Sequence, residues 1–330
     1  MKAVRYDRFG QPHEVAACAE VPDPGPPAAD EVVIEMEACP INPVDLLTIE
    51  GRYAVRPALP ATPGSEGVGR ILAAGDGVRG LAPGDRVLHL GRDNWVQRIR
   101  TKAAQVIKTP AGADVGQLAM AKINPATALL MLRNYRVLGP GEWVLQDAAN
   151  SGVGTCLIRL AHEAGLHSVN VVRREGLAEG LGALGADAVL VDGPDLAERV
   201  RAATGGAPLR LAIDAVAGDI CIRLADCLAD DGVLVNYGLL SGAPCQITAH
   251  QTVFRGITLT GFWLARYLGS APAAEIRALY DEILPRIADG TLAVPIEARY
   301  DISEIQAALA HAARPGRSGK VLLRPNGPVD

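Results

Sequence analysis

The second half of this chain alternates short apolar strands with helices, and this alternation limits the possible folds more than any other feature of the sequence. Strand-like runs rich in Val, Ile and Leu occur at 143–146, 168–172, 188–191, 211–216, 232–236 and 257–261. Strands that are apolar throughout indicate a parallel sheet whose two faces are both covered by helices. The sequence therefore predicts a doubly wound α/β domain.

The first hundred or so residues follow a different pattern. Strand-like runs at 2–6, 31–38, 67–73 and 86–90 are separated by turns rich in Pro and Gly, and no helix alternates regularly with them. Such a pattern is typical of a β-rich domain. We expect a small, strongly bent β-barrel or half-barrel.

The C-terminal tail combines a helical stretch at 273–289, a helix from Ser303 and a last strand at 320–324. Pro285 is expected to kink or interrupt the first helix, because proline cannot donate the helical hydrogen bond. The parallel sheet needs no further strand, so the tail is expected to return to the β-rich domain. The expected domains are 1–118 with 262–330, and 119–261.

Composition narrows the classes of protein. A length of 330 residues favours two cores, and a net charge of −5 without clustered Lys and Arg excludes a nucleic-acid surface. No run approaches the roughly 20 apolar residues of a membrane helix, and the N-terminus lacks the apolar core of a signal peptide. Six cysteines without a CxxC pair indicate thiols in a reducing compartment. We expect a cytoplasmic enzyme.

The turn after the strand at 143–146 is the candidate site for a dinucleotide pyrophosphate. Compared with the pattern G-x-G-x-x-G, the three positions are Ala149, Ser151 and Gly154, so only the last is glycine. An ordinary strand–helix turn is the alternative. The position favours the functional interpretation, because this turn opens the first βαβ unit, and a helix N-terminus binds phosphate.

The end of the second strand indicates which dinucleotide would be bound. Sites that prefer NAD usually carry Asp or Glu there, whereas this chain has Arg173 and Arg174. Guanidinium groups can bind a 2′-phosphate that a carboxylate would repel. The alternative is a pair of solvated surface arginines. We predict a preference for NADPH.

The sequence predicts no metal centre. A zinc-dependent alcohol dehydrogenase needs Cys, His and an acidic residue that converge, together with a cluster of four cysteines. Cys39 has no partner histidine in a suitable pattern, and the six histidines show no paired spacing. A carbonyl substrate would then have to be polarised without a Lewis acid.

Several motifs, taken together, resemble the zinc-free members of the medium-chain dehydrogenase/reductase superfamily, and more narrowly the mitochondrial-type trans-2-enoyl thioester reductases. They are INPVDLLTIEGRY (41–53), PGSEGVG (63–69), NPATA (124–128), NSGVG (150–154), NVVRR (170–174), NYG (236–238), GFWL (261–264) and SGKVLL (318–323). They follow one another in the family's order across nearly the whole chain. The motif NSGVG by itself is shared with related quinone reductases.

This resemblance implies a GroES-like catalytic domain, a Rossmann-type domain and a homodimer joined through the edge strands near 257–261. It implies that Tyr53 is the catalytic tyrosine. The NADPH contacts that it implies are Asn124, Thr127, Asn150, Ser151, Gly152, Val153, Arg173, Arg174, Tyr237, Gly238, Leu239, Leu240, Phe262, Trp263, Leu264 and Lys320. One departure is Glu175, where the family often has a further basic residue, and this weakens the expected grip on a 2′-phosphate.

The implied reaction reduces the 2,3-double bond of a trans-2-enoyl thioester carried by coenzyme A or acyl carrier protein. Hydride from the nicotinamide reaches the β-carbon, and negative charge develops on the thioester oxygen. A hydrogen-bond donor to such an oxygen is typically worth about 3–4 kcal/mol, and Tyr53 is the candidate donor. The alternative for Tyr53 is simple packing. The competing functions are an NADPH-dependent quinone or enone reductase and an NADPH-binding protein without catalytic activity.

Overall fold

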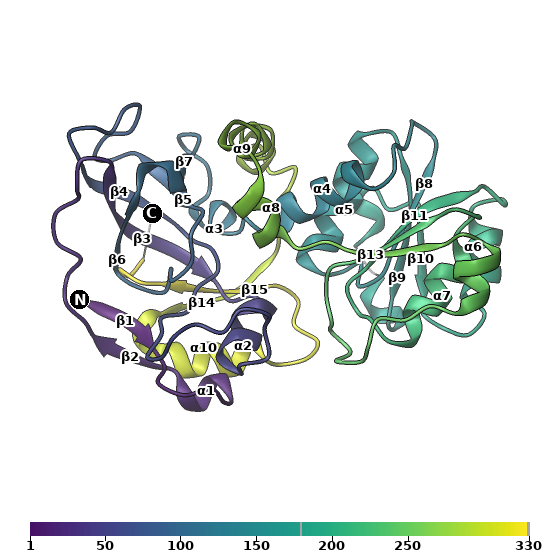
Figure 1. The fold of residues 1–330 in the computed structure, drawn as a ribbon, viewed down its shortest axis with the longest axis horizontal. Coiled ribbons are helices and arrows are strands. Elements are labelled where there is room, and N and C mark those ends of the chain that lie inside the picture. Colours follow the sequence, from purple (N-terminus) through teal and green to yellow (C-terminus); the bar gives the residue numbers. More distant parts are fainter. Residues whose placement is uncertain (179, 329–330) are drawn as a thin grey trace. The chain divides into compact units, whose positions relative to one another are not determined.

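The computed structural model describes residues 1–178 and 180–328 and divides the chain into two compact units (Figure 1). Unit 1 comprises Met1–Ile123 with Pro272–Asp330, and unit 2 comprises Asn124–Ala271. The expected boundaries lie earlier, after residues 118 and 261. The first differs because the Lys122 ammonium donates to the carbonyls of Ser65 and Gly91, which ties the segment 119–123 to unit 1.

Unit 1 is built around a mainly antiparallel sheet with the strand order β14-β15-β3-β4-β5-β7, and β6 pairs with β3. A separate hairpin-like pair is formed by β1 and β2. The elements are β1 (Lys2–Arg5), α1 (Pro12–Val15), β2 (Ala17–Glu20), β3 (Glu31–Pro40), α2 (Pro43–Ile49), β4 (Val68–Ala74), β5 (Arg86–His89), β6 (Arg98–Lys102), η1 (Ala103–Gln105), β7 (Val106–Lys108), α3 (Val115–Leu118), α9 (Ala273–Ala288), β14 (Ile296–Asp301), η5 (Ile302–Glu304), α10 (Ile305–Ala312) and β15 (Lys320–Arg324).

The C-terminal tail returns to unit 1 through β15, which pairs antiparallel with β3 and parallel with β14. Helix α9 runs continuously through Pro285, so the expected interruption does not occur. Trp95 is fully buried in the core beside the sheet, and its indole N–H donates to the carbonyl of Pro40 at 3.3 Å. This core fixes the end of β3, from which α2 and the segment around Tyr53 follow.

Unit 2 contains a six-stranded, all-parallel sheet with the order β10-β9-β8-β11-β12-β13. This is the 3-2-1-4-5-6 order of dinucleotide-binding domains, and it confirms the predicted doubly wound sheet. The elements are α4 (Asn124–Asn134), β8 (Trp143–Gln146), α5 (Gly152–Glu163), β9 (His167–Val172), η2 (Glu175–Leu177), η3 (Gly182–Leu184), β10 (Ala188–Val191), α6 (Leu196–Ala203), β11 (Leu209–Asp214), α7 (Asp219–Cys227), β12 (Val233–Asn236), η4 (His250–Phe254, a π-helix), β13 (Thr258–Gly261) and α8 (Leu264–Ser270).

Successive residues of β9 show that both faces of this sheet are covered (Figure 1). Val171 packs in a cluster with Leu196 of α6 and Leu224 of α7, whereas Val172 packs in a cluster with Ile158 of α5. Neighbouring side chains of a strand point to opposite faces, so α5 lies on one side and the pair α6 and α7 on the other. The apolar strands of the sequence thus fill two cores.

The alternation of strands and helices in the sequence also predicts a helix over 177–184, and this prediction is wrong in the described part of the segment. Two short 3₁₀ turns, η2 and η3, stand there instead, and residue 179 lies outside the described residues. Gly180 and Gly185 have φ of +81° and +98°, a conformation that a regular right-handed helix excludes. Among the described residues, no helix is both long and apolar enough to cross a membrane.

Candidate active site

The turn between β8 and α5 presents the N-terminus of a twelve-residue helix. Ser151 caps this helix, since its hydroxyl accepts a hydrogen bond from the N–H of Gly154 at 3.1 Å. Asn150 is exposed, Ser151 and Gly152 are half-buried, and Val153 is buried. A helix N-terminus carries unpaired N–H groups and the positive end of the helix dipole, so this exposed turn suits an anionic group.

Gly154 is required by a close approach between the helix and the turn. A Cβ atom at this position would come within 2.5 Å of the carbonyl oxygen of Ala149 and within 2.8 Å of that of Ala148. Ala148 itself has a φ of +43°. Gly154 is the one glycine that matches the dinucleotide pattern. A residue with a Cβ atom can replace it only if the backbone moves.

The two arginines after β9 are both exposed. Within the described chain, neither Arg173 nor Arg174 has a side-chain hydrogen bond or an ion pair, whereas other arginines of unit 2, such as Arg210 and Arg223, pair with carboxylates. Glu175 begins η2 and is exposed as well. Two unpaired guanidinium groups at the end of the second strand form a positive patch that suits a phosphate.

The segment after β12 reaches the same helix N-terminus. The phenol of Tyr237 hydrogen-bonds Ser151, and burial raises the pKa of this phenol well above its usual range. Gly238 lies against the backbone of Ala215, because a Cβ there would come within 2.5 Å of the Ala215 carbonyl oxygen. Leu239 and Leu240 are 46% and 57% exposed. The structure thus brings Tyr237 beside Ser151.

A pair of buried carboxyl groups, which the sequence pattern does not reveal as a pair, lies beneath this turn. Asp147 follows β8, Asp214 ends β11, and the two carboxyl groups lie close enough to shift each other's pKa. Burial, followed by the neighbouring Asp214, raises the pKa of Asp147 well above its usual range. Asp147 accepts from the N–H of Ala215 at 2.7 Å, and Asp214 accepts from that of Ala217 at 2.9 Å. The pair therefore fixes the loops at the carboxyl end of the sheet.

Two further groups of predicted residues lie in unit 2. Asn124 and Thr127 stand in the first turn of α4 and are buried, and the side-chain amide nitrogen of Asn124 has no hydrogen-bond partner among the described residues. Phe262 follows β13 and donates its N–H to the carbonyl of Asn236 at 2.9 Å. Trp263 precedes α8, which begins with the buried Leu264. A buried donor without a partner is uncommon, so the side-chain amide nitrogen of Asn124 is a candidate for a ligand contact.

Tyr53 lies in unit 1, just after α2. Its N–H donates to the carbonyl of Leu47 at 3.1 Å, and Gly51, with φ of +73°, turns the chain between them. The guanidinium of Arg92 lies over the ring of Tyr53, 5.6 Å from its centre. Arg92 also donates to the hydroxyl of Thr48 at 3.3 Å. This cation–π contact holds the half-buried ring of Tyr53. The sequence pattern alone does not indicate the contact.

Lys320 belongs to a buried polar network in unit 1. Its ammonium donates to the side-chain carbonyl of Asn42 at 2.6 Å, and the Asn42 amide donates to Glu66 at 2.7 Å. Glu66 is fully buried, and desolvation raises the pKa of its carboxyl to about 7. Desolvation lowers the pKa of the nearby Lys122 to about 8. Lys320 is thus engaged within unit 1, and its predicted contact with NADPH stays a prediction.

The raised pKa of Glu66 makes the stability of the protein depend on pH. The native state holds this proton more tightly than the unfolded state, so the stabilisation from Glu66 is greatest below about pH 4.5 and is lost as the pH rises towards 7. The variant Glu66→Gln does not titrate at this position. We therefore expect the free energy of unfolding of Glu66→Gln, relative to that of wild type, to rise between pH 4.5 and pH 7. The rise is at most about 1.4 kcal/mol per pH unit.

Urea unfolding of wild type and Glu66→Gln at pH 5 and pH 7 measures this trend. Glu198→Gln, at an exposed carboxylate of α6, is the control. A difference between Glu66→Gln and wild type that stays constant, or that falls with pH, would contradict the assignment.

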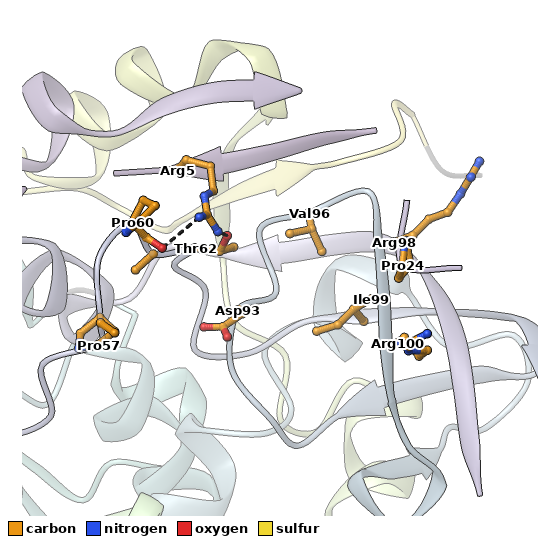
Figure 2. Close-up of a pocket in the computed structure, with 12 residues that line it drawn as sticks. Arg5, Pro24, Pro57, Pro60, Thr62, Asp93, Val96, Arg98, Ile99 and Arg100 are labelled. Carbon is orange, nitrogen blue, oxygen red and sulfur yellow. Dashed lines mark hydrogen bonds between the residues drawn. The ribbon is translucent and has the colours of Figure 1, made fainter. Parts of the chain in front are cut away.

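A groove of about 590 Å³ lies elsewhere on unit 1 and contains none of the predicted site residues (Figure 2). Its arginine side chains already bond to other residues of the chain. Arg5 donates to the hydroxyl of Thr62 and to the carbonyl of Pro60, and Arg98 forms an ion pair with Asp23. Arg100 donates to the carbonyl of Pro26. We assign no function to this groove.

A zinc-dependent site of this kind would include Cys39, but the group of potential metal ligands in the described residues lies in unit 2. Among the described residues, Asp214, Cys221 and Cys245 are the His, Cys, Asp or Glu side chains that meet as a group of three. Cys39 is not among them, and its thiol donates to the carbonyl of Asn94 at 3.2 Å.

Together, the two units define the class of the medium-chain dehydrogenases/reductases, and comparison with known proteins agrees. Residues 28–133 match the family "Alcohol dehydrogenase GroES-like domain", and residues 152–283 match "Zinc-binding dehydrogenase". The chain is 32% identical to the mitochondrial enoyl-[acyl-carrier-protein] reductase of Rattus norvegicus, covering 98% of this chain and 88% of that protein. This chain therefore belongs to the family within that superfamily that includes the mitochondrial enoyl-[acyl-carrier-protein] reductases.

Solved structures extend the likeness. The quinone oxidoreductase of Escherichia coli in complex with NADPH is 27% identical, with a TM-score of 0.89 and coverage of 98% of this chain and all of that chain. A mutant form of the enoyl thioester reductase from Candida tropicalis has the same fold, with a TM-score of 0.85, 24% identity and coverage of 98% and 99%. The resemblance and the fold class predicted from the sequence are thus confirmed.

Proposed function

We propose that this protein uses NADPH to reduce the 2,3-double bond of trans-2-enoyl thioesters of coenzyme A or acyl carrier protein. The observation that carries the proposal is the match, over 98% of the chain, to a relative named enoyl-[acyl-carrier-protein] reductase. Tyr53, held under Arg92, supplies a proton donor of the kind that this reaction needs. The proposed enzyme works without zinc.

The residues of unit 2 fit NADPH. The capped N-terminus of α5 suits the pyrophosphate, and Arg173 and Arg174 suit a 2′-phosphate. The unpartnered amide of Asn124 offers a buried donor for the nicotinamide end. These residues, with Thr127, 150–153, 237–240, 262–264 and Lys320, are the proposed cofactor contacts. The quinone oxidoreductase with 27% identity was solved with NADPH, which supports this choice of cofactor.

We expect the variant Gly154→Ala to bind NADPH at least tenfold more weakly than wild type. Its methyl group would meet the Ala149 carbonyl oxygen at 2.5 Å, so α5 must move away from the turn that receives the pyrophosphate. Fluorescence titration with NADPH measures the change. The control is Gly182→Ala in the same unit, where an added Cβ has no neighbour within 4 Å. Wild-type affinity in Gly154→Ala would contradict the proposed role of the turn.

NADPH, when bound, supplies the hydride that is added to the β-carbon of the substrate. The phenol of Tyr53 donates a hydrogen bond to the thioester oxygen as negative charge develops there. Arg92 holds the ring by its cation–π contact, so the hydroxyl is presented with little loss of side-chain freedom. The α-carbon then receives a proton from solvent, which completes the reduction.

A second candidate is an NADPH-dependent quinone or enone reductase. It is favoured by the TM-score of 0.89 with the Escherichia coli quinone oxidoreductase, whose sequence identity exceeds that of the Candida tropicalis enzyme. The lower alternative is a protein that binds NADPH without turnover. Oxidation of NADPH, followed by absorbance with crotonyl-CoA and with a naphthoquinone in parallel, separates the three. We expect faster turnover of crotonyl-CoA; a faster quinone reaction, or binding without either reaction, would overturn the proposal.

We also propose a homodimer joined through the edge strand β13. This strand ends the parallel sheet, and the π-helix before it carries Val253 and Phe254, which are 70% and 77% exposed. An unpaired strand edge beside two exposed apolar side chains suits a self-complementary contact. None of the six cysteines, which all lie in the described part of the chain, forms a disulfide, and this supports a reducing compartment such as the cytoplasm.

A further inference from the structure

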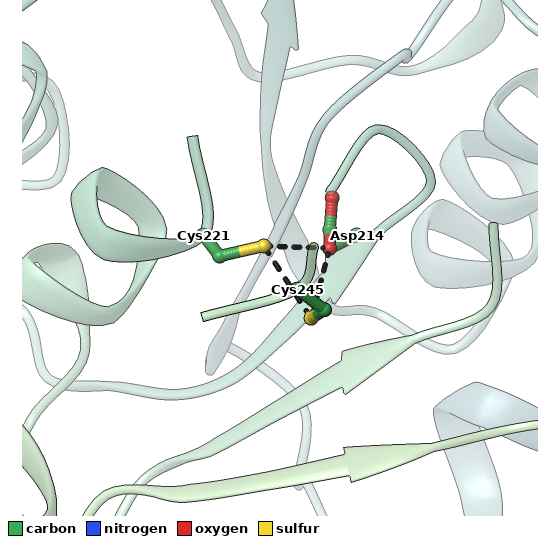
Figure 3. Close-up of side chains that lie close together, drawn as sticks. All are labelled: Asp214, Cys221 and Cys245. Carbon is green, nitrogen blue, oxygen red and sulfur yellow. Dashed lines mark hydrogen bonds between the residues drawn. The ribbon is translucent and has the colours of Figure 1, made fainter. Parts of the chain in front are cut away.

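Cys221, Cys245 and Asp214 meet in unit 2 although they come from three different segments (Figure 3). The two sulfur atoms are 3.5 Å apart. The Cys221 thiol donates to Oδ2 of Asp214 at 3.1 Å, and the Cys245 thiol lies 3.9 Å from the same oxygen. Cys221 is buried and Cys245 is half-buried.

The backbones that carry the two thiols are tied to one residue, Gly218. The N–H of Cys221 donates to the carbonyl of Gly218 at 3.1 Å. Gly218 also forms a β-bridge with Cys245, and its N–H donates to the carbonyl of Pro244 at 3.0 Å. The nearness of the two sulfurs therefore comes from fixed backbone geometry rather than from two free side chains that happen to touch.

We propose that Cys221 and Cys245 are a redox-active thiol pair, a modification site that reacts with small disulfides of the glutathione type to form a reversible protein disulfide. A disulfide needs the sulfurs at about 2.05 Å, so they must approach by about 1.5 Å, which is within reach of side-chain rotation. The distance of 24 positions along the chain makes this a cross-link between α7 and the segment that follows β12.

The reaction proceeds in two exchanges. The thiolate of the more accessible Cys245 attacks one sulfur of the small disulfide, breaks its S–S bond and releases one small thiol. The thiolate of Cys221 then attacks the Cys245 sulfur of the mixed disulfide and releases the second small thiol. In sum, the two protein thiols lose two electrons and two protons, and the small disulfide gains both.

The electrostatics of the pair slow its exchange with small disulfides at neutral pH. Burial, followed by the adjacent carboxylate of Asp214, raises the pKa of the Cys221 thiol well above its usual range. Burial also raises the pKa of the Cys245 thiol. Both groups are therefore protonated at neutral pH, and the exchange becomes faster as the pH rises.

The same three residues could hold a soft metal ion, but the bonds around Asp214 favour the disulfide. Oδ1 of Asp214 already accepts from the N–H groups of Val216 and Ala217, at 2.8 and 2.9 Å. Oδ2 accepts from the amide of Asn236 at 2.6 Å, so a metal would have to compete for it. A disulfide is neutral, needs no ligand from Asp214 and leaves these three hydrogen bonds in place.

The cross-link would fasten a loop that the proposed function uses. Residues 237–240 begin the segment that ends at Cys245, and Ser241 within it donates to the carbonyl of Val216 at 2.7 Å. Oxidation would anchor the far end of this segment to α7. The inference goes beyond the proposed reaction and does not depend on the substrate of the enzyme.

The test treats the full-length protein with millimolar oxidised glutathione at pH 8, counts free thiols in denaturant and maps the cross-linked peptides by mass spectrometry. We expect the number of free thiols to fall from six to four, with Cys221 joined to Cys245, and dithiothreitol to restore all six. The control variant Cys227→Ser removes a half-buried thiol that donates to the carbonyl of Arg223. This variant should still lose two thiols.

Three results would overturn the proposal. The first is no loss of thiols under these conditions. The second is a glutathione adduct that persists on Cys245 while Cys221 stays free. The third is one equivalent of zinc that accompanies the purified protein and blocks oxidation until a chelator removes it, which would assign the cluster to a metal instead.

Discussion

Replacing Tyr53 with Phe should lower kcat with crotonyl-CoA by at least tenfold and leave the affinity for NADPH unchanged. A tenfold loss corresponds to about 1.4 kcal/mol of transition-state stabilisation, and a full oxyanion donor is typically worth 10²–10³ in rate. The substitution removes only the hydroxyl, so the ring still packs under Arg92, 5.6 Å away. The loss should therefore appear in kcat rather than in binding.

The matched control for this variant is Tyr300→Phe. It makes the same chemical change in the same unit, at a hydroxyl that hydrogen-bonds His311 at 2.9 Å. Steady-state kinetics and NADPH titration of both variants give the comparison. Wild-type kcat in Tyr53→Phe would exclude the phenol as donor, and an equal loss in Tyr300→Phe would show a general structural effect instead.

The second large effect is expected at the arginine pair. The double variant Arg173→Ala, Arg174→Ala should raise the Michaelis constant for NADPH at least tenfold and leave that for NADH nearly unchanged. Only NADPH carries the 2′-phosphate, and each charge-assisted hydrogen bond lost there weakens binding of that cofactor alone. Glu175 stays in place in this variant, so its negative charge further disfavours NADPH.

Steady-state kinetics with both cofactors measures this change. Arg201→Ala removes another exposed arginine of unit 2 and serves as the control for a general loss of positive charge. An equal effect of the double variant on NADPH and NADH would contradict specific binding of the 2′-phosphate. The single variants Arg173→Ala and Arg174→Ala then show how much each guanidinium group contributes to binding of the 2′-phosphate.

The parallel sheet of unit 2 was predictable because its signal is local. The run at 211–216 is apolar except for Asp214, and most of it falls on β11, a buried central strand with a neighbour on each side. The exposed position of Arg173 follows from its place directly after β9. Element boundaries and the segment 177–184 were less predictable, since glycines with positive φ break a helix that composition alone favours.

The polar networks around the site could not be read from the sequence. The bond between Lys320 and Asn42 joins residues 278 positions apart, and Asp147 meets Asp214 only because β8 and β11 are neighbours in the sheet. Arg92 reaches Tyr53 from a loop of another part of unit 1. One available signal was the presence of an Asp at the carboxyl ends of two central strands, where loops of this fold meet.

The most direct test of the central claim is to follow the hydride itself. Reaction of crotonyl-CoA with NADPH deuterated at the transferable position of nicotinamide C4, followed by mass spectrometry of the acyl product, shows where the label goes. The proposed function predicts butyryl-CoA with one deuterium at the β-carbon. NADPH oxidation that yields no saturated thioester, or a product labelled elsewhere, would contradict it.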